Sequence, residues 1–397
     1  MANPTPAYDL APVWELLVFG ALLAVVPLAW IAWRHRGSSG ARRLQALTVL
    51  TLFLTFDLVL FGAFTRLTDS GLGCPDWPGC YGQSNPLQAN QQISAAQSAL
   101  PSGPVTHAKA WIEMVHRYLA TGVGALIVLL TVAAWWQWRR WRKGRGEAPS
   151  LSRWWVTATL AWVCVQGAFG ALTVTMRLFP AIVTLHLLGG ATLLALLCVQ
   201  AVQQTFRVHG TGPAPVAWGL RWGLVLGVVL VLLQLLLGGW VSTNYAVLVC
   251  PTFPKCQGSW WPSMAFGEGF QLWRGLGLLA DGSHISFEGL TAIHYVHRLA
   301  AYVVLAVLGW LAWRMLRSGR LTLQGRWLAG LLVLQFLTGL SNVVLGWPLV
   351  AAVMHTGGAA ALLVVLVWAL ASTQVPKARQ QAVPATFAIS SSSGASA

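Results

Sequence analysis

Nine long runs of apolar residues constrain this chain more than any other feature of its sequence. Each run is close to the roughly 20 residues that an α-helix needs to cross the hydrocarbon core of a bilayer. Only 9% of the residues are charged, whereas a soluble domain carries charge at about a quarter of its positions. The sequence therefore predicts an all-α polytopic membrane protein. The runs span residues 11–33, 44–64, 111–138, 154–176, 182–204, 218–241, 292–313, 327–346 and 350–371.

The basic residues predict the orientation of the chain in the membrane. Eighteen of the 25 Lys and Arg residues lie in segments on one side of the predicted membrane, namely 34–43, 139–153, 205–221, 314–326 and 372–397. Because cytoplasmic loops carry the excess of Lys and Arg, the N-terminus is predicted outside and the C-terminus in the cytoplasm. The same clusters account for the net charge of +15. The sequence has no basic face with interleaved aromatic residues, so it does not indicate nucleic acid as a partner.

Eight of the helices form two copies of one unit. Segments 62–82 and 238–258 share glycine and cysteine positions, and EMVHRYLA at 113–120 matches HYVHRLAA at 294–301. Each unit has an even number of helices, so both copies have the same orientation, related by a pseudo-two-fold axis along the membrane normal. The predicted fold is two pseudo-two-fold related four-helix bundles plus one extra N-terminal transmembrane helix. The positions shared by the two segments are Gly62/Gly238, Cys74/Cys250, Cys80/Cys256 and Gly82/Gly258.

The repeat divides the chain into four parts. Residues 1–43 hold the extra helix, which we interpret as retained because no small-residue cleavage site follows it; a signal anchor is the alternative. Residues 44–204 form the N-terminal repeat, and residues 218–371 form the C-terminal repeat. The Ser- and Ala-rich stretch 372–397 is predicted to be a disordered cytoplasmic tail.

Each repeat places one histidine near the outer end of its second helix and another near the outer end of its fourth. These are His116 and His186 in the first copy, and His297 and His355 in the second. Two histidines at matching depth on neighbouring helices can ligate one flat metal macrocycle from both faces. A single buried histidine is more often a hydrogen-bonded core residue, but four at repeat-matched depth in hydrocarbon favour bis-histidine haem.

Charged residues accompany these histidines. Arg117 and Arg298 each follow a histidine directly, and arginine forms bidentate pairs with carboxylates such as haem propionates. The alternative for both is a side chain that extends to lipid phosphate. Glu113 lies one helical turn before His116, where the second copy has His294. A carboxyl group inside the membrane edge is a functional candidate; the alternative is an interfacial glutamate in contact with water.

Two cysteine pairs, CPDWPGC and CPTFPKC, lie in loops on the outer side. Thiols there can oxidise, and a spacing of six with two prolines suits a tight bridged loop. A structural bridge and a redox-active one both remain open. Zinc binding would need further ligands, and none is evident beside either pair.

The combination of GAFTRLTDSGLGCPDWPGC, EMVHRYLA, the TLH and VMH helices and the doubled unit resembles the haem A synthase family across roughly residues 44–371. This resemblance implies a membrane oxidoreductase that oxidises the C8 methyl of haem O to a formyl group, giving haem A for terminal oxidases. His297 and His355 would hold a resident haem b. His116 and His186 would receive haem O, with Glu113 in the catalytic role.

The resemblance further implies that Arg117 and Arg298 contact propionates and that disulfides join Cys74 to Cys80 and Cys250 to Cys256. The implied location is the bacterial inner membrane, among lipid. Haem O synthase and the terminal oxidase assembly machinery are the implied protein partners. Two other classes fit the same histidines: a di-haem electron-transfer protein, which needs no carboxyl at Glu113, and a haem transporter, which needs a site open to both sides.

Overall fold

The computed structural model describes residues 8–9 and 12–375 of the chain. Nine helices in this part are long and apolar enough to cross a membrane. Each corresponds to one predicted apolar run, which confirms the all-α polytopic fold. The spanning helices are α1 (Val13–Arg34), α2 (Gly40–Leu67), α4 (His107–Arg142), α5 (Arg153–Thr175), α6 (Pro180–His209), α7 (Trp218–Thr243), α9 (Phe287–Arg317), α10 (Thr322–Val344) and α11 (Leu349–Ala371).

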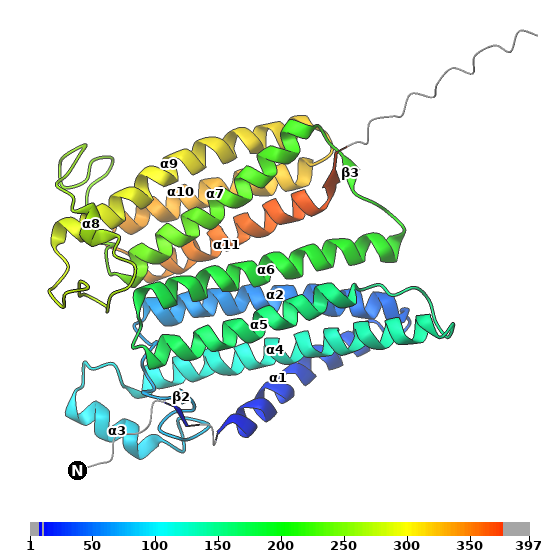
Figure 1. The fold of residues 1–397 in the computed structure, drawn as a ribbon, viewed down its shortest axis with the longest axis horizontal. Coiled ribbons are helices and arrows are strands. Elements are labelled where there is room, and N and C mark those ends of the chain that lie inside the picture. The colour runs from blue at the N-terminus through cyan, green and yellow to red at the C-terminus, as the bar shows by residue number, and fades with distance from the viewer. Residues whose placement is uncertain (1–7, 10–11, 376–397) are drawn as a thin grey trace, which may run out of the picture.

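The remaining elements are short. The helices α3 (Asn90–Ala99) and α8 (Phe266–Gly269) lie in the two long loops on one side of the molecule (Figure 1). The structure also has two short pairs of parallel strands. In one, β1 (Tyr8–Asp9) pairs with β2 (Trp77–Pro78), and in the other β3 (Ala214–Pro215) pairs with β4 (Thr373–Gln374). Most of the predicted tail, residues 376–397, lies outside the described residues.

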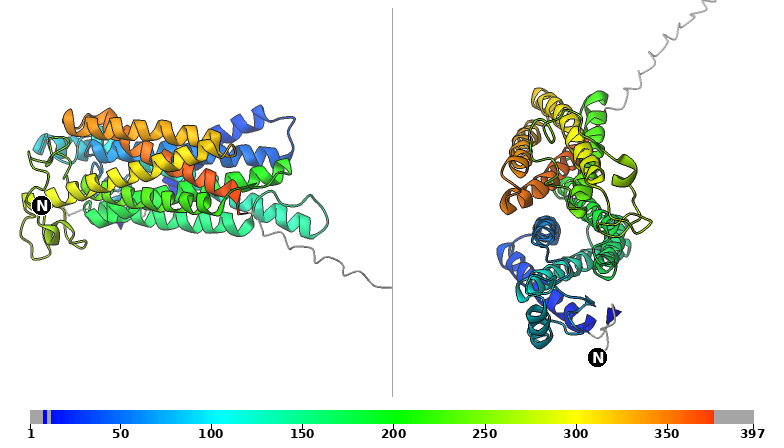
Figure 2. Two further views of the ribbon diagram at one scale, coloured as in Figure 1. Left: turned by 90° about the horizontal axis from the view of Figure 1, so that it is seen from above. Right: turned by 90° about the vertical axis from the view of Figure 1, so that its left-hand side faces the viewer.

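The spanning helices pack as two rings of four. In the first ring α2 and α5 each contact both α4 and α6, and in the second α7 and α10 each contact both α9 and α11. The rings meet where α6 packs against α11 and α7, and where α11 also packs against α2 (Figures 1 and 2). This is the arrangement that a doubled four-helix unit predicts. The domain limits assigned from the sequence remain a prediction.

Repeat-equivalent residues meet between the two rings at one end of the bundles. Arg66 donates to the carbonyl oxygen of Ser242 at 2.6 Å, and Tyr245 donates to the Asp69 carboxylate at 2.7 Å. Arg66 also pairs with Asp69 at 3.1 Å. Since Arg66 and Ser242 occupy matching places in the repeat, as do Asp69 and Tyr245, the contact marks the pseudo-two-fold axis.

Helix α1 lies outside both rings and packs on α4 and α2. Gly20 permits its close approach, because a Cβ at that position would lie 2.8 Å from the Cβ of Thr121 on α4. The other sides of α1 expose large apolar residues such as Trp14, Leu22 and Val26. In a membrane those residues would face lipid.

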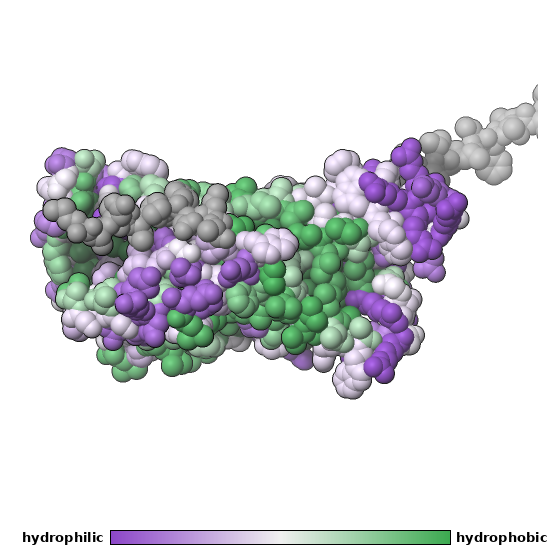
Figure 3. All heavy atoms as spheres, turned by 90° about the horizontal axis from the view of Figure 1, so that it is seen from below, coloured by the Kyte–Doolittle hydropathy of each residue, from purple (hydrophilic) through white to green (hydrophobic). Residues whose placement is uncertain are grey.

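The surface has the distribution expected of a membrane-spanning protein. An apolar zone covers the middle of the helices, and hydrophilic residues gather toward the ends (Figure 3). Together with the length of the helices, this surface defines a multi-pass membrane protein.

Candidate functional site

The helix starts place the four histidines at matched depths. Thr106 caps α4 by accepting from the Lys109 N–H at 3.3 Å, and Ser286 caps α9 by accepting from the Gly289 N–H at 3.0 Å. His116 and His297 follow these caps by nearly three turns. In α6 and α11 the histidine is in each case the seventh residue of the helix.

Each histidine ring lies against a glycine of the neighbouring helix. At three of the glycines a Cβ would lie only 3.0 Å from the ring Cε1, closer than side chains normally pack, and at Gly170 it would lie in ordinary contact at 3.5 Å. The four contacts are Gly62 with His116, Gly170 with His186, Gly238 with His297, and Gly339 with His355. The repeat therefore preserves both the histidine and the space that its ring occupies.

All four histidines line one continuous cavity of about 1160 Å³ inside the described chain. Its walls are mostly apolar, with Gln234, Gln166, Arg66 and Glu113 among the polar residues. Sites for a single small ligand usually measure roughly 300–1,000 Å³. The cavity is thus large enough for a ligand of macrocycle size, and it joins the two histidine pairs.

Each histidine of the C-terminal pair has a polar neighbour at Nδ1, and the neighbour of His355 suits metal ligation. Thr338 Oγ1 lies 3.0 Å from His355 Nδ1 and donates its own proton to the Leu334 carbonyl at 2.8 Å. The hydroxyl therefore accepts from Nδ1–H, which leaves the lone pair of Nε2 free for a metal. The Gln234 side-chain nitrogen Nε2, a donor, lies 3.0 Å from His297 Nδ1 and donates to the His297 carbonyl at 3.1 Å.

The N-terminal pair lacks such neighbours. Within the described residues, Nδ1 of His116 and Nδ1 of His186 are buried without a hydrogen-bond partner. Leu58 and Phe169 stand at the positions that correspond to Gln234 and Thr338. The two histidine pairs thus share their depth and their glycines but differ in the polar groups around them.

Glu113 is buried, with 4% of its surface exposed, and has two partners. One carboxylate oxygen pairs with Arg117 at 2.5 Å, and the other accepts from the Cys74 N–H at 2.8 Å. The predicted alternative of an interfacial glutamate in contact with water is therefore wrong. Arg117 also donates to the carbonyls of Asp76 and Pro78, at 3.1 and 3.0 Å.

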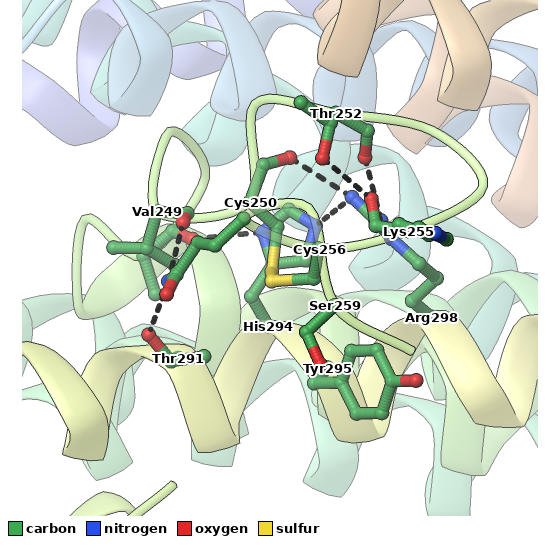
Figure 4. Close-up of a disulfide and its surroundings, with 12 residues drawn as sticks. Val249, Cys250, Thr252, Lys255, Cys256, Ser259, Thr291, His294, Tyr295 and Arg298 are labelled. Atoms are coloured by element: carbon green, nitrogen blue, oxygen red, sulfur yellow. Dashed lines mark hydrogen bonds between the residues drawn. A yellow bond between two sulfur atoms is a disulfide. The ribbon is translucent and has the colours of Figure 1, made fainter. Parts of the chain in front are cut away.

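The second repeat builds the same support from a different residue. Arg298 donates to the carbonyls of Cys250 and Thr252, each at 2.9 Å, and to His294 Nε2 at 3.2 Å (Figure 4). His294 Nδ1 lies 2.8 Å from the Ala246 carbonyl, so this ring links the arginine to the loop as Glu113 does in the first repeat. The sequence did not reveal this use of the two arginines as anchors of the cysteine loops, and their contact with propionates remains a prediction.

Disulfides close both loops. The Cα atoms of Cys74 and Cys80 are 4.9 Å apart, and those of Cys250 and Cys256 are 4.7 Å apart, within the usual range for bridged cysteines. All four side chains are fully buried. Each bridge holds the loop whose carbonyls receive an arginine, at the mouth of one histidine site.

Thiol alkylation tests the bridges. In freshly isolated membranes without reductant, a maleimide should label none of the four loop cysteines. After reduction under denaturing conditions all four should become reactive. Mass spectrometry of the labelled peptides distinguishes these outcomes, and labelled loop cysteines before reduction would rule out the bridges.

The fold and site define a class: multi-pass helical membrane proteins in which two related bundles each present a histidine pair to one apolar cavity. The chain belongs to the family described as Cytochrome oxidase assembly protein, whose model matches residues 45–367. The matched range begins after α1 and includes all four histidines.

Named relatives support the same family. The chain is 37% identical to a heme A synthase of Shewanella oneidensis over 318 residues, which cover 80% of this chain and 93% of that protein. It is 30% identical to a heme A synthase of Sinorhizobium medicae, over 85% of this chain and 90% of the relative. A heme A synthase of Allorhizobium ampelinum is 29% identical over 85% and 92% of the two chains.

Proposed function

We propose that this protein is a haem A synthase that oxidises the C8 methyl of haem O to a formyl group, a four-electron oxidation that takes one oxygen atom from water or dioxygen and needs an external electron acceptor or dioxygen as oxidant. The observation that carries the proposal is the pair of histidine sites in one cavity, alike in geometry and different in polar surroundings. The names of its relatives support the same activity. An oxidoreductase acting on haem needs one site that retains a cofactor and another that exchanges substrate and product.

The C-terminal pair, His297 and His355, is the proposed site of a resident haem b. The Thr338 hydroxyl fixes the proton of His355 on Nδ1, so Nε2 is available to iron. When bound there, a haem supplies one-electron redox chemistry. The apolar walls keep water away from that centre.

The N-terminal pair, His116 and His186, is the proposed site for haem O as substrate. Nothing in the described chain holds Nδ1 of either ring, and an exchangeable site requires weaker retention. Glu113 lies one turn from His116, and we assign it the catalytic role. Its carboxylate can take up a proton or stabilise positive charge that develops on the substrate ring.

The setting of this activity is also proposed. Lys and Arg clusters favour an N-terminus outside and a C-terminus in the cytoplasm of a bacterial inner membrane. The histidines then lie near the outer face, where Arg117 and Arg298 would meet propionates. Haem O synthase would supply the substrate, and terminal oxidase assembly would consume the product.

Pigment analysis of the purified protein tests the function. Extracted haems should include haem b together with haem O or haem A, and added haem O should be converted to haem A under turnover conditions. Haem b alone in both sites, with no conversion, would instead indicate a di-haem electron-transfer protein.

Thr338 provides a test of the resident site. Thr338→Val keeps the shape of the side chain but removes the acceptor for His355 Nδ1–H, so haem b should transfer to apomyoglobin faster. Loss of such a partner typically costs about 10- to 100-fold in metal affinity. Thr338→Ser should restore slow transfer.

Thr192→Val is the matched control, because among the residues that the structure describes the Thr192 hydroxyl bonds only to the Leu188 carbonyl of its own helix. It should leave the transfer rate unchanged. Equal rates in Thr338→Val and wild type would show that Thr338 does not support the ligand.

A further inference from the structure

The seam between α4 and α5 has a gap beside the N-terminal histidine pair. Gly124 on α4 and Gly167 on α5 both line the cavity that contains His116 and His186. A Cβ at either glycine would find nothing within 4 Å outside its own stretch of helix. Since packed helices fill such space with side chains, the seam is open at this level.

The two glycines lie at about the same height in the bundle. Trp135 on α4 donates to the Thr157 hydroxyl on α5 at 3.0 Å, which sets the register of these antiparallel helices. Gly124 is eleven residues from Trp135 toward the outer end of α4, and Gly167 is ten residues from Thr157 toward the outer end of α5. The two steps are nearly equal in length, so the two glycines, which both line the cavity, lie at a similar height on adjacent helices.

The C-terminal bundle has bulky residues at the same two places. When His116 is aligned with His297, Leu305 is the residue equivalent to Gly124. When His186 is aligned with His355, Phe336 is the residue equivalent to Gly167. Both residues line the cavity on that side. The opening is therefore specific to the site proposed for the substrate.

Residues around the gap connect the cavity with the lipid-facing surface. Val128 and Cys164 line the cavity, yet Val128 is 44% exposed and Cys164 is also exposed.

We propose that this gap is a subsite for the long isoprenoid substituent of haem O. The inference rests on the proposed function, since it needs haem O at His116 and His186. An apolar tail that leaves the cavity between Gly124 and Gly167 reaches lipid without crossing water. Haem b has no such tail, which suits the closed seam at Leu305 and Phe336.

Filling the seam tests the subsite. Gly124→Leu and Gly167→Phe introduce the residues of the other repeat, and the purified protein with its resident haem b is titrated with haem O or with additional haem b. We expect haem O to bind at least about tenfold more weakly to the variants, because the tail loses its buried apolar contacts. Binding of additional haem b should change less than about twofold, which also reports that the variants are folded.

Gly330→Leu is the control for added bulk, since Gly330 has open space at its Cβ but does not line the cavity. Equal weakening of both haems, or of neither, would overturn the subsite. A wild-type protein that binds neither haem at His116 and His186 would instead overturn the proposed function.

Discussion

Replacing Glu113 by Gln is expected to abolish haem A formation while the fold and the bound haem b persist. The change removes the charge but keeps an oxygen that can accept from the Cys74 N–H. Arg117 retains its bonds to the carbonyls of Asp76 and Pro78, so the loop should stay in place. Removal of a positioned acid or base typically lowers a rate by roughly 10²–10⁴.

The measurement is the amount of haem A formed from haem O by equal amounts of purified protein, with haem b content determined in parallel. His294→Gln is the matched variant, because His294 joins its arginine to its loop in the other repeat. It should retain haem A formation. Wild-type activity in Glu113→Gln would remove the catalytic assignment, and a parallel loss of haem b would show that Glu113 serves only to anchor the loop.

The sequence was sufficient to predict the membrane helices because length and apolar composition alone decide which segments can cross a bilayer. Their ends were less predictable. The run 111–138 became a helix from His107 to Arg142, since polar residues at the interface continue the helix beyond the hydrocarbon. The short helices α3 and α8 lie in loops, where no apolar run marks them.

The depth of the histidines was also predictable, because an internal repeat compares each residue with a second copy in the same chain. The hydrogen-bond partners of these histidine rings were not predictable from the sequence. Thr338 meets His355 from another helix, and which helix faces meet depends on packing that no single segment encodes. The bonds from Arg117 and Arg298 to the loop carbonyls were unpredictable for the same reason, because those contacts form only when the disulfide loops fold back over the helix ends.

Alanine at His297 or His355 is expected to remove haem b from the C-terminal site. Both rings line the cavity, and each stands against a glycine that leaves no side chain to replace the lost ligand. A haem held by one axial histidine loses its low-spin bis-histidine spectrum, and with a ligand gone the apolar site retains it poorly. Haem b content and the low-spin absorption should therefore fall together in either variant.

His116→Ala and His186→Ala provide the comparison, because their positions in the fold are equivalent while their proposed ligand is the substrate. These variants should keep the resident haem b and lose bound haem O and its product. The two classes of variant must separate in this way if the repeats hold different haems. Identical haem losses in all four would show that the sites are not specialised, and unchanged haem content after His297→Ala and His355→Ala would exclude the C-terminal pair as ligands.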